Sequence, residues 1–200
     1  MFLVSVPVFF QAPLVRAYPL LSLILTLGWL ALGRSLQADA STYRTGDLIV
    51  GFTWTWLAGS IYWGWFRHEP LLHLPIEAVG LPFALVCLLN QRNRIGNWFY
   101  LGSLFGTGMT DLYFYSVDLI PHWRRLMQVD LSMVGPIFQD AVLRMETPMG
   151  VAWAIAIVTT LLVVGLIPLR SPHIHWRVFS GAVLSTVLVD GLFWIAVSSS

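Results

Sequence analysis

Four carboxylic acids fall inside otherwise apolar stretches of the chain, and they are the side chains best placed to do chemistry. Glu77 lies in the third such stretch, Asp111 and Asp118 in the fourth, and Asp190 in the sixth. An acid at the centre of a membrane span costs roughly 2.5 to 3.5 kcal/mol, so it normally faces the bundle interior and has a partner or holds a proton. All four are therefore candidate catalytic groups. The alternative is that they are hydrogen-bonded between helices and only fix the packing.

The fourth apolar stretch is predicted to carry a continuous polar face. At 100° per residue, six polar side chains fall within an arc of about 120°. Gly102 and Gly106 add a small-residue spacing that lets another helix approach closely, either within the chain or from another subunit. Asp190, in the sixth stretch, has Thr186 and Trp194 one turn away on its face. The polar face of the fourth stretch comprises Ser103, Thr107, Asp111, Tyr115, Asp118 and His122.

A second group of titratable residues lies at the start of the third apolar stretch. His73 and Glu77 are four residues apart and share a helix face if Pro75 allows the helix to continue. His73 thus joins the catalytic candidates. Because this stretch also contains Gly80 and Pro82, we expect a kinked or broken helix, which membranes tolerate where protein or a water-filled cavity meets the freed backbone groups.

The histidines are the candidates for holding a cofactor, although the sequence does not identify one. An imidazole can be an axial ligand of chlorophyll or haem, which is chemically open for His68, His73 and His122. Glu69 and Glu77 could join His68 and His73 around a metal ion, but their spacing matches no closed structural motif, so we predict no metal site. The single Cys87 excludes an intramolecular disulfide and a multi-cysteine metal cluster.

Composition makes the chain a membrane protein. Of its 200 residues, 57% are hydrophobic and 10% are charged, against about 25% charged in soluble domains. The net charge of +1 gives no reason to expect a nucleic-acid partner. We predict one all-α transmembrane domain over residues 1–200, a polytopic bundle of about six spans. The candidate spans are 15–36, 46–66, 70–90, 97–120, 149–169 and 178–197.

Features outside these spans are expected to lie at the membrane surface. Between the fourth and fifth spans, apolar residues recur every three to four positions from His122 to Pro148, which predicts an interfacial amphipathic helix interrupted at Gly135–Pro136. The segment Met1–Ala12 lacks the positive region of a secretory signal, so we expect it to be retained.

No Arg or Lys lies inside a span, so the acids need hydroxyls, interfacial His or Arg, water, a cation, a ligand or another subunit as partners.

The arginines fall into two groups that six spans would place on opposite sides of the membrane. The two groups contain five and six arginines, a difference too small to fix the orientation by the positive-inside rule. Fewer acids lie near the second group, which favours the cytoplasmic side of the membrane for that group. The first group is Arg16, Arg67, Arg124, Arg125 and Arg144, and the second is Arg34, Arg44, Arg92, Arg94, Arg170 and Arg177.

Two stretches of sequence resemble a known family. The run from Trp63 to Pro82, with its Arg67-His68-Glu69-Pro70 and Leu74-Pro75-Ile76-Glu77 segments, and the opening Gln11–Arg16 resemble uncharacterised cyanobacterial membrane proteins defined only as a domain of unknown function. The resemblance implies a photosynthetic source and a thylakoid or plasma membrane, but no activity.

A thinner similarity links one of these segments to an enzyme family. Leu74–Glu77 is similar to the Pro-x-Glu-Glu stretch of small membrane-embedded lycopene cyclases. Here Ala78 replaces the second acid and the following aromatic pair is missing, so no catalytic role is transferred.

The sequence favours one function and leaves two alternatives, in the following order. The first is an accessory or assembly subunit of a larger, photosynthetic membrane complex, with other membrane subunits or pigments as partners besides the lipid bilayer. The second is a membrane-embedded enzyme acting on an isoprenoid, pigment or lipid, with Glu77, Asp111 or Asp190 moving a proton. The third is a small proton- or ion-coupled transporter whose polar path follows the fourth span.

Overall fold

The chain folds into long helices, and the all-α prediction is confirmed. A computed structural model describes residue 3 and residues 10–198, and every regular element in this part of the chain is helical. Pro19 separates a short helix from the first long one. The principal helices are α2 (Ala12–Ala17), α3 (Pro19–Gln37), α4 (Tyr43–Ile61), α5 (His73–Glu77), α6 (Leu81–Leu89), α7 (Arg94–Ser116), α8 (Ile120–Leu126), α9 (Val134–Met145), α10 (Pro148–Leu169) and α11 (Ile174–Ser198).

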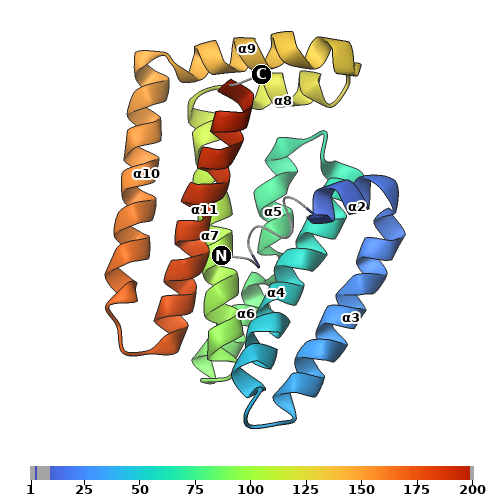
Figure 1. Ribbon diagram of the computed structural model, residues 1–200, viewed down its shortest axis with the longest axis vertical. Coiled ribbons are helices and arrows are strands. Elements are labelled where there is room, and N and C mark those ends of the chain that lie inside the picture. Colours follow the sequence, from blue (N-terminus) through green and yellow to red (C-terminus); the bar gives the residue numbers. More distant parts are fainter. Residues whose placement is uncertain (1–2, 4–9, 199–200) are drawn as a thin grey trace.

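Helix α7 is the hub of the bundle. It packs against α4, α5, α6, α10 and α11, while α3 packs against α4 and α10 against α11 (Figure 1). The turns at 38–42, 90–93 and 170–173 gather at one end, which we call the lower end. At the opposite, upper end, α8 and α9 run across the long helices.

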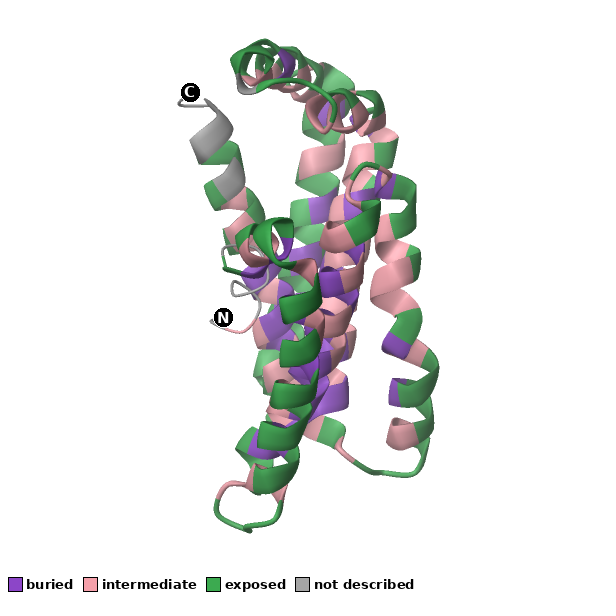
Figure 2. Cartoon of the chain, turned by 90° about the vertical axis from the view of Figure 1, so that its right-hand side faces the viewer, coloured by how far each residue is buried: buried purple, intermediate pink, exposed green. Residues whose placement is uncertain are grey.

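Three helices are long and apolar enough to cross a membrane: Pro19–Gln37, Pro70–Leu89 and Pro148–Leu169. The other long helices are not apolar enough by the same criterion; they are α4, α7 and α11. Length and apolar composition alone therefore support three spans rather than the predicted six. The apolar helices are the least buried ones, and Figure 2 shows buried residues concentrated on the inner helices. Neighbouring helices cover the acids of α4 and α7, Asp47 and Asp111, whereas Asp190 of α11 is exposed.

The third apolar stretch is a broken helix, as Pro75, Gly80 and Pro82 predict. A 3₁₀ turn at Pro70–Leu72 leads into α5, a second 3₁₀ turn at Ala78–Gly80 follows, and α6 begins at Leu81. Pro75 falls in the first turn of α5, where its missing N–H would have no partner in the helix in any case. His73 and Glu77 consequently belong to the same helical turn.

The predicted extension of the fourth span to residue 120 is wrong. Helix α7 ends at Ser116, and Asp118 has a left-handed φ of 60°. The Leu119 N–H donates to Phe114 O at 2.9 Å and the Asp118 N–H to Tyr115 O at 3.4 Å, which is the Schellman pattern that terminates many helices. His122 belongs to α8, so the polar face of α7 stops before both Asp118 and His122.

The amphipathic segment between the fourth and fifth long helices forms two helices rather than one. Helix α8 ends at Leu126, a 3₁₀ turn covers Leu131–Met133, and α9 begins at Val134. The interruption thus precedes Gly135–Pro136, because a proline is compatible with the first turn of a helix. Both helices lie across the upper end of the bundle, which agrees with the predicted surface position (Figure 1). Most of the segment Met1–Ala12 lies outside the described residues, so the structure does not test its predicted retention.

Glycines set the closest helix contacts. A Cβ on Gly96 of α7 would meet the backbone of Asp47 on α4, and one on Gly51 of α4 would meet the backbone of Gly96. A Cβ on Gly102 would lie 2.7 Å from Phe179 O, and one on Gly106 would collide with Thr186. The small-residue face of α7 therefore packs within the chain, against α11.

Candidate functional site

The central feature of the site is an ion pair between the broken third segment and α7. The Nδ1–H group of His73 donates to Asp111 Oδ1 at 2.9 Å. The side chain of Asp111 is 10% exposed and that of His73 is 24% exposed. Helix α5 provides His73 and α7 provides Asp111, so the pair joins two elements that lie far apart in sequence.

Aromatic and polar groups hold the imidazole of His73 in position. The Tyr62 ring, in the π-helical end that follows α4, lies 4.3 Å from the His73 ring between centroids, at an interplanar angle of 35°.

The second carboxylate oxygen of Asp111, Oδ2, is buried and has no hydrogen-bond partner among the described residues. Asp111 thus keeps one oxygen that can accept a proton or a cation.

Glu77 joins this ion pair from the C-terminal end of α5. It interacts electrostatically with both His73 and Asp111. The Tyr100 hydroxyl of α7 donates to the backbone carbonyl of Glu77 at 2.6 Å, which fixes this end of α5 against α7. The Glu77 carboxyl therefore lies near enough to the His73–Asp111 pair to influence its charge.

Asp190 approaches the same region from α11. The Thr110 hydroxyl donates to Asp190 Oδ2 at 2.8 Å, and Asp190 interacts electrostatically with Asp111, the residue next to Thr110. Thr186, one turn before Asp190, is buried against Gly106. We call His73, Glu77, Asp111 and Asp190, with Thr110, the carboxyl cluster.

The other predicted site residues do not belong to the carboxyl cluster. Asp118 caps α7, its side chain is 65% exposed, and Arg144 Nη2 approaches its Oδ2 at 3.4 Å. His68 is exposed near the start of the broken segment. His122 Nε2 lies 3.1 Å from Asp140 Oδ2 in the surface layer formed by α8 and α9. Of the three candidate cofactor ligands, only His73 belongs to the carboxyl cluster.

Ion pairs hold this surface layer to the upper end of the bundle. Arg124 Nη2 donates to both carboxylate oxygens of Glu69, at 2.8 and 2.9 Å, and this hydrogen bonding lowers the pKa of Glu69. The hydrogen bond from Arg125 to Asp140 likewise lowers the pKa of that carboxyl. The Trp123 indole donates to Arg67 O at 2.7 Å.

Among the described residues, no group of three or more His, Cys, Asp or Glu side chains is arranged to hold a metal ion. In particular, His68 and Glu69 do not combine with His73 and Glu77 into such a site. Glu69 instead pairs with Arg124.

Sequence reasoning identified the four titratable members of the carboxyl cluster but missed their supporting residues. Thr110 and Tyr62 were not predicted, although a hydroxyl and an interfacial histidine were among the partners expected for the acids. The adjacency of Thr110 and Asp111 was a usable signal, because neighbouring residues on a helix point about 100° apart and can face two different helices. Asp47 was also missed: it is buried in α4 and accepts a hydrogen bond at 2.9 Å from the Ile95 N–H in the first turn of α7.

Together, the fold and the carboxyl cluster describe a membrane-like helical protein with titratable groups between its helices. The chain belongs to the DUF3120 family, described as a protein of unknown function, whose profile matches residues 1–198. No curated protein and no solved structure matches the chain. The predicted membership of a family defined only as a domain of unknown function is confirmed.

Proposed function

We propose that the chain is a small proton-coupled membrane transporter in which the carboxyl cluster takes up and passes on protons. The observation that carries this proposal is the 2.9 Å pair between His73 and Asp111, with the carboxyls of Glu77 and Asp190 near enough to interact electrostatically with Asp111. Chains of Asp, Glu and His within membrane segments are typical of proton relays. Three carboxyl groups beside one imidazole cannot all be ionised in a low-dielectric interior, so the cluster retains an exchangeable proton.

The proposal includes six membrane crossings. Besides the three apolar helices, α4, α7 and α11 run alongside them and contain 19, 23 and 25 residues. A helix of about 20 residues spans the roughly 30 Å hydrocarbon core. Coverage by the outer helices supports spanning by these inner helices despite their polar residues.

Proton uptake into proteoliposomes tests the function. With the purified chain, an imposed potential should drive uptake that a pH-sensitive dye inside or outside the vesicles detects. Asp111→Asn and His73→Gln should abolish this uptake. Asp118→Asn is the matched control, because it removes a carboxyl from the same part of the sequence but outside the carboxyl cluster, and it should keep the uptake of the unmodified chain. Equal rates in Asp111→Asn and the unmodified chain would exclude the relay.

A second candidate function is that of an accessory or assembly subunit of a larger membrane complex. It is favoured by the exposure of Asp190 on α11, together with exposed Leu188, Leu192 and Trp194. In lipid, an acid at such a surface favours a protein partner that covers it. Co-migration with a larger assembly on native gels would support this function, and migration only as a small free particle would argue against it. A photosynthetic complex, in a thylakoid or plasma membrane, is the version suggested by sequence resemblance.

A further inference from the structure

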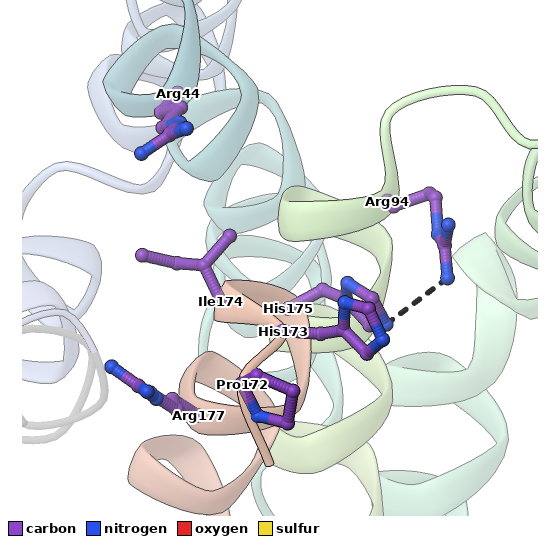
Figure 3. Close-up of a pocket in the computed structure, with 7 residues that line it drawn as sticks. All are labelled: Arg44, Arg94, Pro172, His173, Ile174, His175 and Arg177. Carbon is purple, nitrogen blue, oxygen red and sulfur yellow. Dashed lines mark hydrogen bonds between the residues drawn. The ribbon is translucent and has the colours of Figure 1, made fainter.

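The lower end of the bundle contains a cavity of about 420 Å³ whose polar lining is entirely basic. Arg44, Arg94 and Arg177 contribute guanidinium groups, and His173 and His175 contribute imidazoles. Figure 3 shows the three arginines on different sides of the histidine pair, with each arginine on a different helix. No acidic residue lines the cavity.

The two acids of the lower end are engaged elsewhere. Asp39 accepts a hydrogen bond from the Ser41 N–H at 2.8 Å, within its own turn. Asp47 accepts one from the Ile95 N–H. The positive charge of the cavity is consequently left without a carboxylate partner among the described residues that line it.

Helix direction adds to this positive potential. Helices α4, α7 and α11 begin at Tyr43, Arg94 and Ile174, so their N-terminal ends lie together at the lower end. Each N-terminus carries a partial positive charge, which favours anions, although in α7 the Ile95 N–H already donates to the Asp47 carboxylate. The same end of the bundle thus combines three helix N-termini with the basic lining of the cavity.

The hydrogen bond from Arg94 fixes the tautomer of His175, which lines the cavity. Its side chain is buried, and Arg94 Nη2 lies 3.1 Å from its Nε2. Because a guanidinium can only donate, Nε2 must accept, and the proton of the neutral imidazole is on Nδ1. The His173 and His175 rings stack at 5.4 Å between centroids. On the far side, Arg177 is fixed by its Nε donating to Ser171 O at 3.0 Å.

We propose that this cavity binds a phosphate group, carried either by a lipid headgroup or by a small soluble anion. Arginines recognise phosphate through paired, charge-assisted hydrogen bonds, and the three arginines line the cavity from separate helices. The turns that form the cavity lie at the end of the bundle, where the apolar helices end and headgroups are expected.

Binding to the full-length chain tests this inference, with two probes that distinguish the sources. In the first arm, inorganic phosphate is titrated into protein in neutral detergent, with chloride at matched ionic strength as reference. In the second, the protein is placed in phosphatidylcholine nanodiscs with and without phosphatidylglycerol, and retained lipid is measured by native mass spectrometry. Arg94→Gln with Arg177→Gln should weaken phosphate or phosphatidylglycerol binding at least about tenfold, since each charged hydrogen bond contributes on the order of 1.5 kcal/mol or more.

Arg92→Gln is the matched control, because Arg92 is an exposed arginine two residues from Arg94 that does not line the cavity. It should bind like the unmodified chain. Arg44→Gln, on a different helix, provides a second cavity variant if the double variant does not fold. Phosphate binding in detergent identifies a soluble anion as ligand, and retention of phosphatidylglycerol alone identifies a headgroup. Binding no stronger than that of chloride and phosphatidylcholine, or an equal loss in Arg92→Gln, overturns the inference.

Discussion

His73 on the broken third segment and Asp111 on the continuous helix α7 form an ion pair of 2.9 Å inside the bundle. The proline-rich segment makes this possible, because its helix begins at His73 after a 3₁₀ turn and directs the imidazole toward α7. A single unbroken helix over residues 70–89 would not start a new helical segment at His73, next to Asp111. The break in the third segment and the carboxyl cluster are therefore parts of one arrangement.

Energetic coupling between His73 and Asp111 is the first prediction. His73→Ala and Asp111→Ala should each destabilise the folded chain by about 2 kcal/mol, because each leaves a charged partner unpaired in a largely buried site. The double variant should lose less than the sum, with a coupling energy of about 1 kcal/mol or more. Unfolding in mixed detergent micelles measures all four free energies. Strictly additive losses would show that the two side chains do not interact.

Close backbone contact between α4 and α7 gives a second prediction. Gly96→Ala should destabilise the bundle by about 1 to 3 kcal/mol, because the new Cβ would overlap the backbone of Asp47, which cannot move aside as a side chain can. Gly28→Ala is the matched control in α3, where a Cβ meets nothing within 4 Å. It should be neutral or stabilising by roughly 0.5 kcal/mol, through helix propensity. Thermal unfolding of both variants in the same detergent compares them directly, and similar losses would contradict the close contact.

The helical class was predictable because apolar runs of span length have few other folded states in lipid. The position of the helix end at Ser116 was harder to predict. Asp118 looked like another acid on a polar helix face, but its backbone is left-handed and it caps the helix. Asp is one of the few residues that tolerate this conformation, and Pro121 shortly afterwards signals a new helix start. Both features indicated a helix end near Asp118, but the helical periodicity of the polar residues was the stronger signal.

The convergence of the carboxyl cluster could not be derived from sequence, because it depends on which helices become neighbours. Glu77, Asp111 and Asp190 come from three different segments, and helical periodicity fixes only the face on which each side chain lies. The glycines of α7 indicated which face of this helix packs closely against another helix. Gly102 and Gly106 mark the face that α11 covers, but the sequence left open whether the partner was this helix or another subunit.

A pH dependence at the upper end is the third prediction. The Arg124 hydrogen bond lowers the pKa of Glu69 below its ordinary value of 4.5. A depressed carboxyl pKa stabilises the docked state at pH values above 4.5, and that contribution is lost as the pH falls through the lower, folded-state pKa. Helix α8 should therefore loosen in the acid range below pH 4.5, seen as faster amide hydrogen exchange over Ile120–Leu126 after correction for the intrinsic rate.

Glu69→Gln is the control for this third prediction. Its exchange in α8 should already be faster at neutral pH, and the acid-dependent change assigned to Glu69 should disappear. Asp140, whose pKa is also lowered, by Arg125, pairs α9 with α8, so its own acid-dependent change should remain in Glu69→Gln and should appear in both helices. Identical acid profiles for Glu69→Gln and the unmodified chain would show that Glu69 does not hold α8 in place.

The common location of three turns gives the last prediction, which tests the six crossings. Single cysteines at Ser41, Arg92 and Ser171, in a Cys87→Ser background, lie in the three lower-end turns, so a membrane-impermeant thiol reagent should label all three from the same side of sealed vesicles. A cysteine at Gln128, between α8 and α9, should react only from the opposite side. Three spans alone would leave at least one lower-end turn on the same side as residue 128. Labelling of Arg92→Cys and Gln128→Cys from the same side would therefore exclude the six-crossing arrangement and, with it, the burial of the carboxyl cluster within the bilayer.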